Sequence, residues 1–316
     1  MTKVRLAEES RHARAFERAA RTYHDASRLQ AEAARRLADL WPLSDALCAN
    51  TVRSSPLRIL EAGAGTGHLT AALVQKFLSA KSALDAPDSA RLHLTVTDLS
   101  SAMLEEARRR LAATFGDELA RDLAFLIAAA EALPRIPEVR TGAPYDLIAA
   151  ASVLQWVADP ATLFREWADL LRPGGYLLVS VFGPDNLREI RTLSGGGLPA
   201  PEPNAWESIL GPGYELEALQ CDTIVERYPT PRAVLAQLRA TGVNGLPANA
   251  HSDDKTNCDA SDDAAFAPYP SPARTLRTRA GLAAWEAAYR ERFSDADGRV
   301  TLTWTPVRFL ARRVRN

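Results

Sequence analysis

Apolar and polar positions follow two different periods along the first part of the chain. Short, almost continuous apolar runs predict buried β-strands, and between them apolar residues recur at the spacing of an amphipathic helix. The predicted strands are Leu57–Ala62, Leu92–Thr97, Ala124–Ala128, Tyr145–Ala151 and Tyr176–Phe182. The predicted helices are Leu69–Ala80, Ala102–Phe115 and Ala161–Leu171. Strands and helices that alternate through short connections predict an α/β fold with a Rossmann-like, doubly wound parallel sheet.

The segments on either side have other patterns. Residues 8–41 place apolar side chains at helical spacing among Arg and Glu, and predict one or two N-terminal helices. Residues 183–213 are rich in Gly and Pro, and the polar residues 246–272 predict a loop or a disordered insertion. The remaining predictions are a strand at Asp222–Tyr228, helices at Pro231–Thr241 and Leu282–Phe293, and a last strand at Val300–Ala311 with Pro306 at an edge or a bulge.

These patterns divide the chain into four parts. We predict N-terminal helices over residues 1–50 and an α/β core over residues 51–183. A helical insertion after the fifth strand, with the polar segment inside it, covers residues 184–299. Residues 300–316 are predicted to return to the core sheet as its final strand.

Composition excludes several classes of protein. The 316 residues include 38 Lys+Arg and 39 Asp+Glu, so the net charge of -1 gives no basic excess for nucleic-acid binding. Three scattered cysteines and five histidines without ligand spacing argue against a disulfide framework or a metal site. The longest uncharged apolar run, Leu147–Ala158, is far shorter than the roughly 20 residues of a membrane helix, and the charged N-terminus lacks a signal-peptide core. We therefore expect a cytoplasmic, soluble monomer without a metal.

The strongest local motif is LEAGAGTGHLT, residues 60–70. A predicted strand leads into a Gly-x-Gly-x-Gly turn and then a helix, which lets the backbone turn tightly and a ligand approach closely. The glycines alone also suit dinucleotide-binding proteins. Glu61, directly before the turn, is placed to meet an amino-acid ammonium, and Asp98, at the end of the second strand, to accept hydrogen bonds from ribose hydroxyls. Asp98 follows Gly63 by 35 residues, whereas dinucleotide sites use about 20.

On these residues the chain resembles the class I S-adenosylmethionine-dependent methyltransferases. LEAGAGTG, VTDLSSAML, AEALP, YDLIAAASVLQWV and LLRPGGYLLVSVF resemble successive motifs of that superfamily, in order, across residues 57–182. The resemblance implies S-adenosylmethionine as cofactor. It implies that three glycines line the methionine moiety, that Asp98 binds ribose and that two apolar residues flank adenine. The glycines are Gly63, Gly65 and Gly67, the adenine neighbours Leu99 and Met103, and Glu131 of AEALP completes the implied cofactor-binding set.

One departure from the superfamily pattern lies before Glu131. Many relatives carry an Asp there that meets the adenine amino group, whereas this chain has Ala128, Ala129 and Ala130. A missing hydrogen bond of this kind typically costs about 1 kcal/mol. Either cofactor affinity is reduced or a backbone group substitutes.

A second resemblance covers nearly the whole chain, apart from residues 246–272. FERAARTYHDASRLQ at residues 16–30 is similar to the opening helix of the malonyl-acyl-carrier-protein O-methyltransferases, which start pimelate assembly for biotin. LQW at residues 154–156 and FGPDNLREIR at residues 182–191 agree with that family, as do LAQLRATGVN and the final helix and strand. The resemblance implies an acidic partner, acyl carrier protein bearing a malonyl group. It also implies that the N-terminal helix closes over the site as a lid.

Methyl transfer to a carboxylate sets modest demands on catalytic side chains. A malonyl carboxylate is already ionised at neutral pH, so alignment and exclusion of water matter more than a general base. Arginine matches a carboxylate with its planar fork. Arg191 and Arg188, just past the fifth strand, are the candidates, with Arg239 as a third, although an arginine on a helix is often only a solvated residue.

Three more residues complete the candidate site. Tyr23 is either a core aromatic residue of the first helix or, as the resemblance implies, a lid that shields the methyl group. Gln155 and Trp156 lie at the carboxyl end of the fourth strand, where open α/β sheets bind ligands, and Trp156 is alternatively a packing residue. A basic face for the acidic carrier is expected in the first helix and the C-terminal tail. Its residues are Arg11, Arg14, Arg18, Arg21, Arg308, Arg312, Arg313 and Arg315.

Other functions remain open at this point. The chain could methylate a small molecule or a quinone precursor on the same fold. FGPDNLREIR also resembles methyltransferase-like assembly factors of mitochondrial complex I, which modify an arginine. A non-catalytic methyltransferase-like binding protein is the third alternative, and the alanines at 128–130 favour it. The Tyr–Leu–Gln signature near the N-terminus favours the malonyl thioester enzyme over these.

Overall fold

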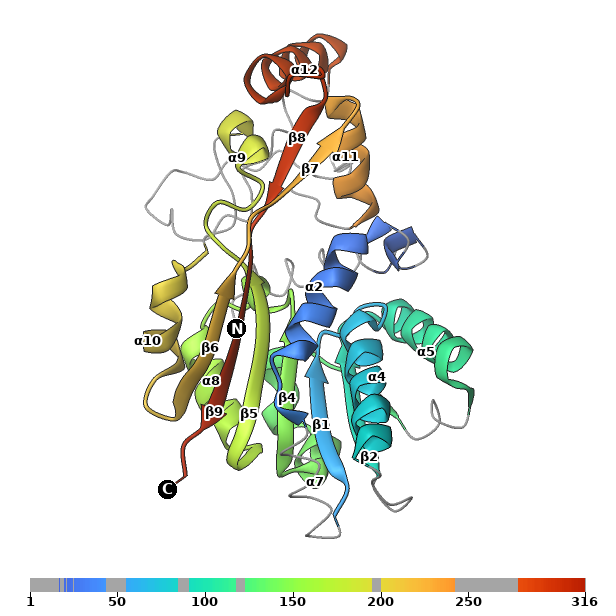
Figure 1. Cartoon of the computed structure of the whole chain (residues 1–316), viewed down its shortest axis with the longest axis vertical. Coiled ribbons are helices and arrows are strands. Elements are labelled where there is room, and N and C mark those ends of the chain that lie inside the picture. The colour runs from blue at the N-terminus through green and yellow to red at the C-terminus, as the bar shows by residue number, and fades with distance from the viewer. Residues whose placement is uncertain are drawn as a thin grey trace, which may run out of the picture.

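One large mixed sheet forms the base of the fold in a computed structural model, and a smaller cap lies above it (Figure 1). The structure describes residues 17, 20, 22–24, 26–43, 55–84, 91–117, 123–194, 200–241 and 278–315. The large sheet has the strand order β3-β2-β1-β4-β5-β9-β6. Its strands are β1 (Leu57–Ala62), β2 (Leu92–Asp98), β3 (Ala124–Ile127), β4 (Tyr145–Ala151), β5 (Leu171–Phe182), β6 (Tyr214–Cys221) and β9 (Pro306–Arg313).

The order of the strands fixes where a ligand can bind. β1 to β5 are parallel, and β9 runs antiparallel between β5 and β6. From β1 the chain extends the sheet through β2 and β3 and then returns to add β4 on the other side. Such a reversal leaves a crevice at the carboxyl ends of the strands, which is where open α/β sheets bind ligands. The predicted Rossmann-like, doubly wound sheet is confirmed.

Helices cover both faces of the sheet and close two apolar cores. Side chains from α2 (Arg28–Asp39), α4 (His68–Ala83) and α5 (Ser101–Phe115) pack with one face. The second core packs against the other face and includes residues of η1 (Ala130–Arg135), α7 (Pro137–Gly142), α8 (Pro160–Ala168) and α10 (Trp206–Leu210). β1 and β4 contribute to both cores because their successive side chains alternate between the two faces. Their near-continuous apolar sequences follow from this two-sided burial.

The cap has a core of its own. Its sheet is an antiparallel pair of strands, β7 (Ile224–Tyr228) and β8 (Val300–Trp304). Three helices pack with these strands: α9 (Arg188–Ser194), α11 (Pro231–Ala240) and α12 (Arg279–Phe293). Trp285, Tyr289 and Trp304 are buried among leucine and valine side chains there. The buried Glu189 joins α9 to β8, since its carboxylate accepts hydrogen bonds from Thr303 N–H at 2.9 Å and Thr303 Oγ1 at 2.6 Å. Figure 1 shows the cap above the carboxyl ends of the parallel strands.

Three sequence predictions about elements need correction. Val300–Ala311 is two strands, because Pro306 begins a separate strand and Thr305 divides β8 in the cap from β9 in the large sheet. β6 was not predicted, since YELEALQC is an edge strand whose side chains are largely exposed and lack a buried apolar run. β5 begins at Leu171 rather than at the predicted Tyr176, and its pairing with β4 shifts register near its start. The polar segment 246–272 lies outside the described residues.

No helix among the described residues is long and apolar enough to span a bilayer.

Candidate functional site

A pocket opens at the carboxyl ends of β1, β2 and β4, beneath α2. The glycine turn after β1, the end of β2 and the segment after β3 form three of its walls. Ser152, Val153 and Trp156, which follow β4, line a fourth side together with Ser180 of β5. Tyr23 and residues of α2 lie over it from the N-terminal part of the chain. The residues that line the pocket therefore come from several separate segments between Tyr23 and Ser180.

The glycine turn is shaped by close contact and by backbone conformation. Gly63 and Gly65 line the pocket with φ of +68° and +55°, in the left-handed region that favours glycine. A Cβ on Gly63 would lie 2.2 Å from Cγ2 of Val153, whereas a Cβ on Gly65 would meet no atom within 4 Å. Gly67 is not among the pocket-lining residues. It is the N-cap of α4, with φ of +85°. The absence of a side chain at Gly67 lets Ala107 of α5 approach closely, because a Cβ on Gly67 would lie 3.2 Å from the Ala107 Cβ.

Asp98 ties the end of β2 to the glycine turn. Its carboxylate accepts hydrogen bonds from Gly65 N–H and Ser100 N–H, both at 2.8 Å. Burial raises the pKa of Asp98 and these backbone hydrogen bonds oppose the rise. A carboxylate offers about four acceptor positions, so two remain for ligand hydroxyls. The N-cap of α5 is Ser100 rather than Asp98, and this leaves Asp98 facing the pocket.

Two apolar side chains beside Asp98 line the same wall. Leu99 is 46% exposed, which is unusual for a large apolar residue in this protein. Met103, in the first turn of α5, is buried and also lines the pocket. The predicted placement of Leu99 and Met103 at one pocket wall therefore agrees with the structure, and their contact with adenine stays a prediction.

Glu61 brings a buried carboxyl group to the floor of the pocket. The side chain is 1% exposed, and its Oε2 accepts a hydrogen bond from Thr70 Oγ1 of α4 at 2.7 Å. Burial raises the pKa of Glu61 to about 7, although the Thr70 hydrogen bond lowers it in part. A buried carboxylate needs a positive partner or further donors. Glu61 is consequently poised to receive a cationic group of a ligand.

The wall after β3 is apolar. Ala128, Ala129 and Ala130 line the pocket together with Glu131, and Ala128 N–H donates to the Asp98 carbonyl at 2.9 Å. The carboxylate that many superfamily members place here is replaced by methyl groups. Any hydrogen bond to a ligand from these three positions has to come from the backbone.

The N-terminal segment lies over the pocket as a strap, which we define as residues 22–24 and 26–27. Tyr23 lines the pocket, and desolvation of its hydroxyl together with the negative charge of Asp98 raises the pKa of Tyr23 to about 12. The phenol therefore stays protonated and neutral at physiological pH, which excludes it as a general base. A shielding role, as predicted for the lid, fits this chemistry. Residues 1–16 lie outside the described part of the chain.

The remaining candidates lie around the pocket rather than in it. Gln155 does not line it: its Nε2 donates to the Ser152 carbonyl at 2.8 Å, and so supports a residue held at φ of +58°. Arg188, Arg191 and Arg239 are not among the lining residues either. Arg188 is exposed and its Nε lies 3.9 Å from Glu189, whereas Arg191 is half-buried on α9 and pairs with no described side chain. Arg239 is exposed near the end of α11.

Sequence reasoning missed part of the pocket. Gln30 and Ala33 of α2, His68 of α4 and Val153 all line it. The Leu-Gln pair in the N-terminal motif was a usable signal for Gln30, because that motif contributed to the resemblance. His68 gave no signal, since its ring partner His24 is 44 residues away in the sequence.

Several known proteins are similar to this chain in sequence. A family described as a methyltransferase domain matches residues 60–177. Malonyl-acyl-carrier-protein O-methyltransferase of Porphyromonas gingivalis is 39% identical over 168 residues, which cover 53% of this chain and 56% of the relative. The namesake in Bacteroides fragilis is 29% identical over 95% of this chain and 50% of its own length. The chain thus spans about half the length of these two relatives.

A third relative decides the family. Malonyl-acyl-carrier-protein O-methyltransferase of Haemophilus ducreyi is 32% identical over 216 residues, which cover 66% of this chain and 74% of the relative. The chain belongs to the malonyl-acyl-carrier-protein O-methyltransferase family. The suspected class I methyltransferase is thereby confirmed, and S-adenosylmethionine is the methyl donor of this class.

The residues of the pocket fit that donor. Gly63 and Gly65 leave the turn without side chains, Glu61 is a buried carboxyl group without a cationic partner among its described contacts, and Asp98 retains free acceptor positions. These would hold the amino-acid and ribose parts of S-adenosylmethionine. Among the described residues, no group of three His, Cys, Asp or Glu side chains is arranged to bind a metal ion.

The raised pKa of Glu61 predicts pH-dependent cofactor binding. Burial favours the neutral carboxyl group, whereas an ammonium ligand requires the carboxylate, so binding must release a proton below pH 7. With a pKa of about 7, affinity for S-adenosylhomocysteine should be about tenfold weaker at pH 6 than the limit above pH 7. The ammonium of a free amino acid has a higher pKa than the value of about 7.7–8.0 of a peptide N-terminus. The ligand therefore keeps its charge in calorimetry from pH 5.5 to 7.5, and a change in affinity over this interval reports on the protein.

The variant Glu61→Gln is the control for this dependence. It cannot ionise at this position, so it should bind more weakly and with little change between pH 5.5 and 7.5. A wild-type affinity that is constant over the same interval would contradict the role assigned to Glu61.

Proposed function

We propose that the protein transfers a methyl group from S-adenosylmethionine to the free carboxylate of malonyl-acyl carrier protein, giving the methyl ester that primes pimelate and biotin synthesis. The observation that carries this proposal is the relationship to enzymes named for that substrate, which extends over 95% of the chain and so includes the cap. The sheet alone would not support it, since this fold hosts many reactions. Methyltransferases acting on small molecules, on quinone precursors or on protein arginines share the sheet.

The chain's own groups suit a reaction without a general base. When bound, S-adenosylmethionine supplies a methyl group made electrophilic by its sulfonium. The acceptor carboxylate is already ionised at neutral pH, so no proton has to be removed. Tyr23, with its pKa of about 12, neither takes nor gives a proton and serves to exclude water. Glu61 and Asp98 orient the donor from below, and the strap closes the pocket from above. The protein contributes alignment, which is the main requirement of a direct displacement.

Arg191 is the proposed partner of the acceptor carboxylate. It lies on α9, directly after β5 and its pocket-lining Ser180, and pairs with no described side chain. α9 is held in place by its own Glu189, which accepts from Thr303 N–H of β8, and by Leu187, whose N–H donates to the Thr303 carbonyl at 2.8 Å. A fixed helix with an unpaired guanidinium is suited to bidentate recognition of a carboxylate. Arg188, 3.9 Å from Glu189 and exposed, is a weaker candidate.

The structure changes the expected docking face for the carrier. Arg308 is buried, with its Nη2 2.7 Å from Asp222, and is unavailable to a partner. Arg312 and Arg313 lie at the end of β9 that pairs with the beginning of β5, opposite the pocket. The tail is therefore unsuited to deliver a substrate to the pocket, and the arginines of the first helix, Arg11, Arg14, Arg18 and Arg21, lie outside the described residues.

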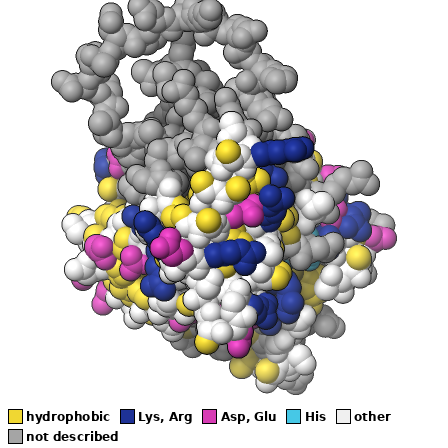
Figure 2. All heavy atoms as spheres, turned by 90° about the horizontal axis from the view of Figure 1, so that it is seen from above, with side chains coloured by type: hydrophobic (Ala, Val, Ile, Leu, Met, Phe, Trp, Pro, Cys, Tyr) yellow, Lys and Arg dark blue, Asp and Glu magenta, His cyan; other side chains and the backbone are white. Residues whose placement is uncertain are grey.

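The cap provides the more suitable basic surface. Seen from above, arginine side chains are spread over this end of the molecule, with acidic groups among them (Figure 2). The exposed arginines of α11 and α12 include Arg239, Arg279, Arg290 and Arg292. An acidic carrier protein approaching from this side would meet attractive charge at the face next to α9.

Mass spectrometry of the carrier protein tests the proposal. Incubation with S-adenosylmethionine and malonyl-acyl carrier protein should add one methyl group to the carrier, and acetyl-carrier protein should gain none. The rate with the carrier should fall with ionic strength more steeply than the rate with a small malonyl thioester. No gain in mass, with cofactor binding confirmed by calorimetry, would reject the malonyl substrate and favour another methyltransferase or a non-catalytic relative.

A further inference from the structure

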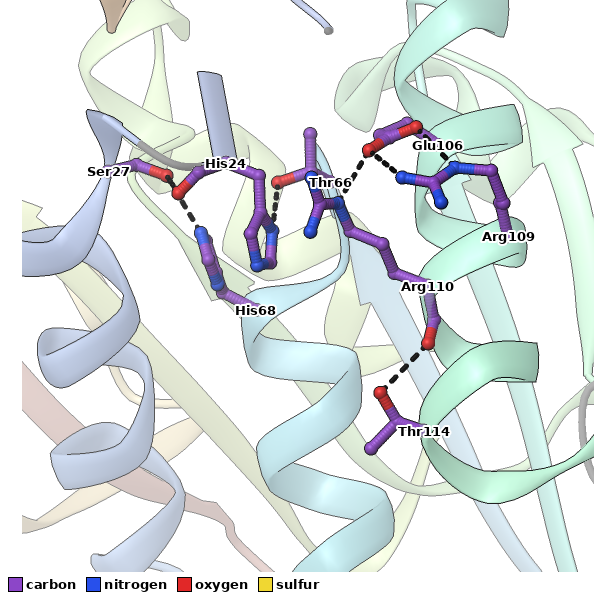
Figure 3. Close-up of polar contacts among 8 residues, drawn as sticks. All are labelled: His24, Ser27, Thr66, His68, Glu106, Arg109, Arg110 and Thr114. Atoms are coloured by element: carbon purple, nitrogen blue, oxygen red, sulfur yellow. Dashed lines mark hydrogen bonds and ion pairs between the residues drawn. The ribbon is translucent and has the colours of Figure 1, made fainter. Parts of the chain in front are cut away.

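A pair of stacked histidines joins the strap to the glycine turn. The rings of His24 and His68 lie 4.2 Å apart at an interplanar angle of 24°. His24 is on the strap, and His68 is the first residue of α4, directly after Gly67. Figure 3 shows the His24 ring between Thr66 and His68, so that the strap is seated on the turn that lines the pocket.

Two hydrogen bonds complete the junction. His24 Nδ1 lies 3.2 Å from Thr66 Oγ1, and His68 Nε2 lies 2.8 Å from Ser27 Oγ. Ser27 Oγ also donates to the His24 carbonyl at 3.0 Å. A hydroxyl has one proton to donate, so the Ser27 oxygen must accept from His68, which fixes the proton of neutral His68 on Nε2. Ser27 is fully buried and does not line the pocket.

The surroundings of the pair keep His68 neutral. Burial, the His24 ring and the guanidinium of Arg110 lower the pKa of His68 to about 4. Arg110 is itself paired with Glu106 on α5, as Figure 3 shows. The stack therefore persists at physiological pH without charge repulsion between the two rings.

Other anchors hold the strap independently of the histidines. Gln237 Nε2 of α11 donates to the Ala26 carbonyl of the strap at 2.7 Å, and Glu17, which precedes the strap, accepts hydrogen bonds from Ser100 and Ser101 at the start of α5. The α2 helix that follows the strap is packed into the core through Ala34, Leu37 and Ala38. Loss of the histidine junction should thus loosen the strap over the glycine turn and leave the fold intact.

We propose that Ser27, His24 and His68 form a latch that holds Tyr23 over the pocket and thereby controls how fast the cofactor leaves. Ser27 and His24 are positioning residues, because neither lines the pocket and both act on it through His68 and the strap, whereas His68 also lines the pocket. The inference rests on the proposed function only in taking the pocket as the S-adenosylmethionine site. Lifting the strap breaks the stack and both hydrogen bonds, so the latch should slow any dissociation that requires Tyr23 to move away from the pocket.

Dissociation of S-adenosylhomocysteine from the full-length protein tests the latch. Stopped-flow measurement can follow the fluorescence of Trp156, which lines the pocket, during displacement by excess S-adenosylmethionine. Ser27→Ala and His68→Ala should each raise the dissociation rate about tenfold, and the double variant should be no faster than His68→Ala, because Ser27 reaches the latch through its hydrogen bond to His68. His68→Gln keeps an N–H donor for Ser27 and should recover part of the effect. In steady state, the KM for S-adenosylmethionine should rise while kcat does not fall.

The chain offers a matched control. His93→Ala removes an exposed histidine of β2 that does not line the pocket and should leave the rate unchanged. An unchanged rate in Ser27→Ala, or a double variant about a hundredfold faster than wild type, would overturn the latch while cofactor binding itself persists. Failure of the wild-type protein to bind S-adenosylhomocysteine would instead overturn the proposed function, and the latch with it.

Discussion

Replacing Gly63 with alanine should abolish detectable cofactor binding and lower the free energy of unfolding by about 2–5 kcal/mol. The added Cβ would lie 2.2 Å from Val153 Cγ2, and the residue would have to keep φ at +68°. Both the contact and the backbone strain destabilise the variant. The turn can relieve the contact only by moving Val153, which also lines the pocket, so cofactor binding should be lost as well. Denaturant unfolding and calorimetry with S-adenosylhomocysteine measure the two effects.

Two further variants separate the contact from the strain. Gly298→Ala has a similar φ, +73°, with no atom within 4 Å of the new Cβ, and it lies outside the pocket. It should lose about 1–2 kcal/mol of stability through strain alone and bind the cofactor normally. Adding Val153→Ala to Gly63→Ala should restore the part of the stability lost to the contact. Wild-type affinity in Gly63→Ala would show that the turn does not cradle the cofactor.

Arg191→Ala should lower kcat/KM for malonyl-acyl carrier protein about a hundredfold while the Kd for S-adenosylhomocysteine stays constant. Loss of a charge-assisted pair with a carboxylate costs about 1.5–3 kcal/mol, and 1.4 kcal/mol corresponds to a factor of ten. The cofactor constant should not change, because Arg191 does not line the pocket. Arg191→Lys keeps the charge but loses the planar fork, so an intermediate loss of about tenfold is expected.

Arg188→Ala is the matched control on the same helix. Its guanidinium is exposed and 3.9 Å from Glu189, so its removal should change kcat/KM by less than about threefold, as surface ion pairs contribute little. If Arg188→Ala is the more damaging variant, the carboxylate partner has been assigned to the wrong arginine of α9. If neither variant affects turnover, the acceptor is held by another part of the chain.

Much of the cofactor side could be predicted because it is encoded locally. Leu57–Ala62 and Tyr145–Ala151 are strands with the predicted bounds, since a strand buried on both faces needs an unbroken apolar run. Glu61, Gly63, Gly65, Asp98, Leu99, Met103 and Glu131 line the pocket as the motifs predicted. Each of them lies within a few residues of a strand end, where a parallel sheet directs its ligands.

The acceptor side was less predictable because its elements depend on contacts between distant segments. Arg308 was expected on the surface, but the return of β9 into the sheet buries it beside Asp222. Gly67 looked like a third cofactor glycine, and its place is set instead by the approach of Ala107 on α5. Gln155 looked like a ligand-facing residue, and it supports the Ser152 backbone. For each of these residues, the residue type and its spacing in the sequence are the same whether the side chain faces a ligand or packs within the protein. Only the packing of distant segments decides which of the two occurs.

The sequence by itself determined the Rossmann-like sheet, the glycine turn, the acidic residues that flank it and the family of the chain. The sheet and the turn follow from periodicity and backbone freedom over a few neighbouring residues, whereas the family was indicated by the resemblance of several motifs in order along the chain. Only the tertiary structure decided that Tyr23 lines the pocket, that His24 stacks on His68 and that Val153 requires a glycine at position 63. Each of these contacts joins segments dozens of residues apart, and no local pattern specifies which side chains meet when the helices and strands pack.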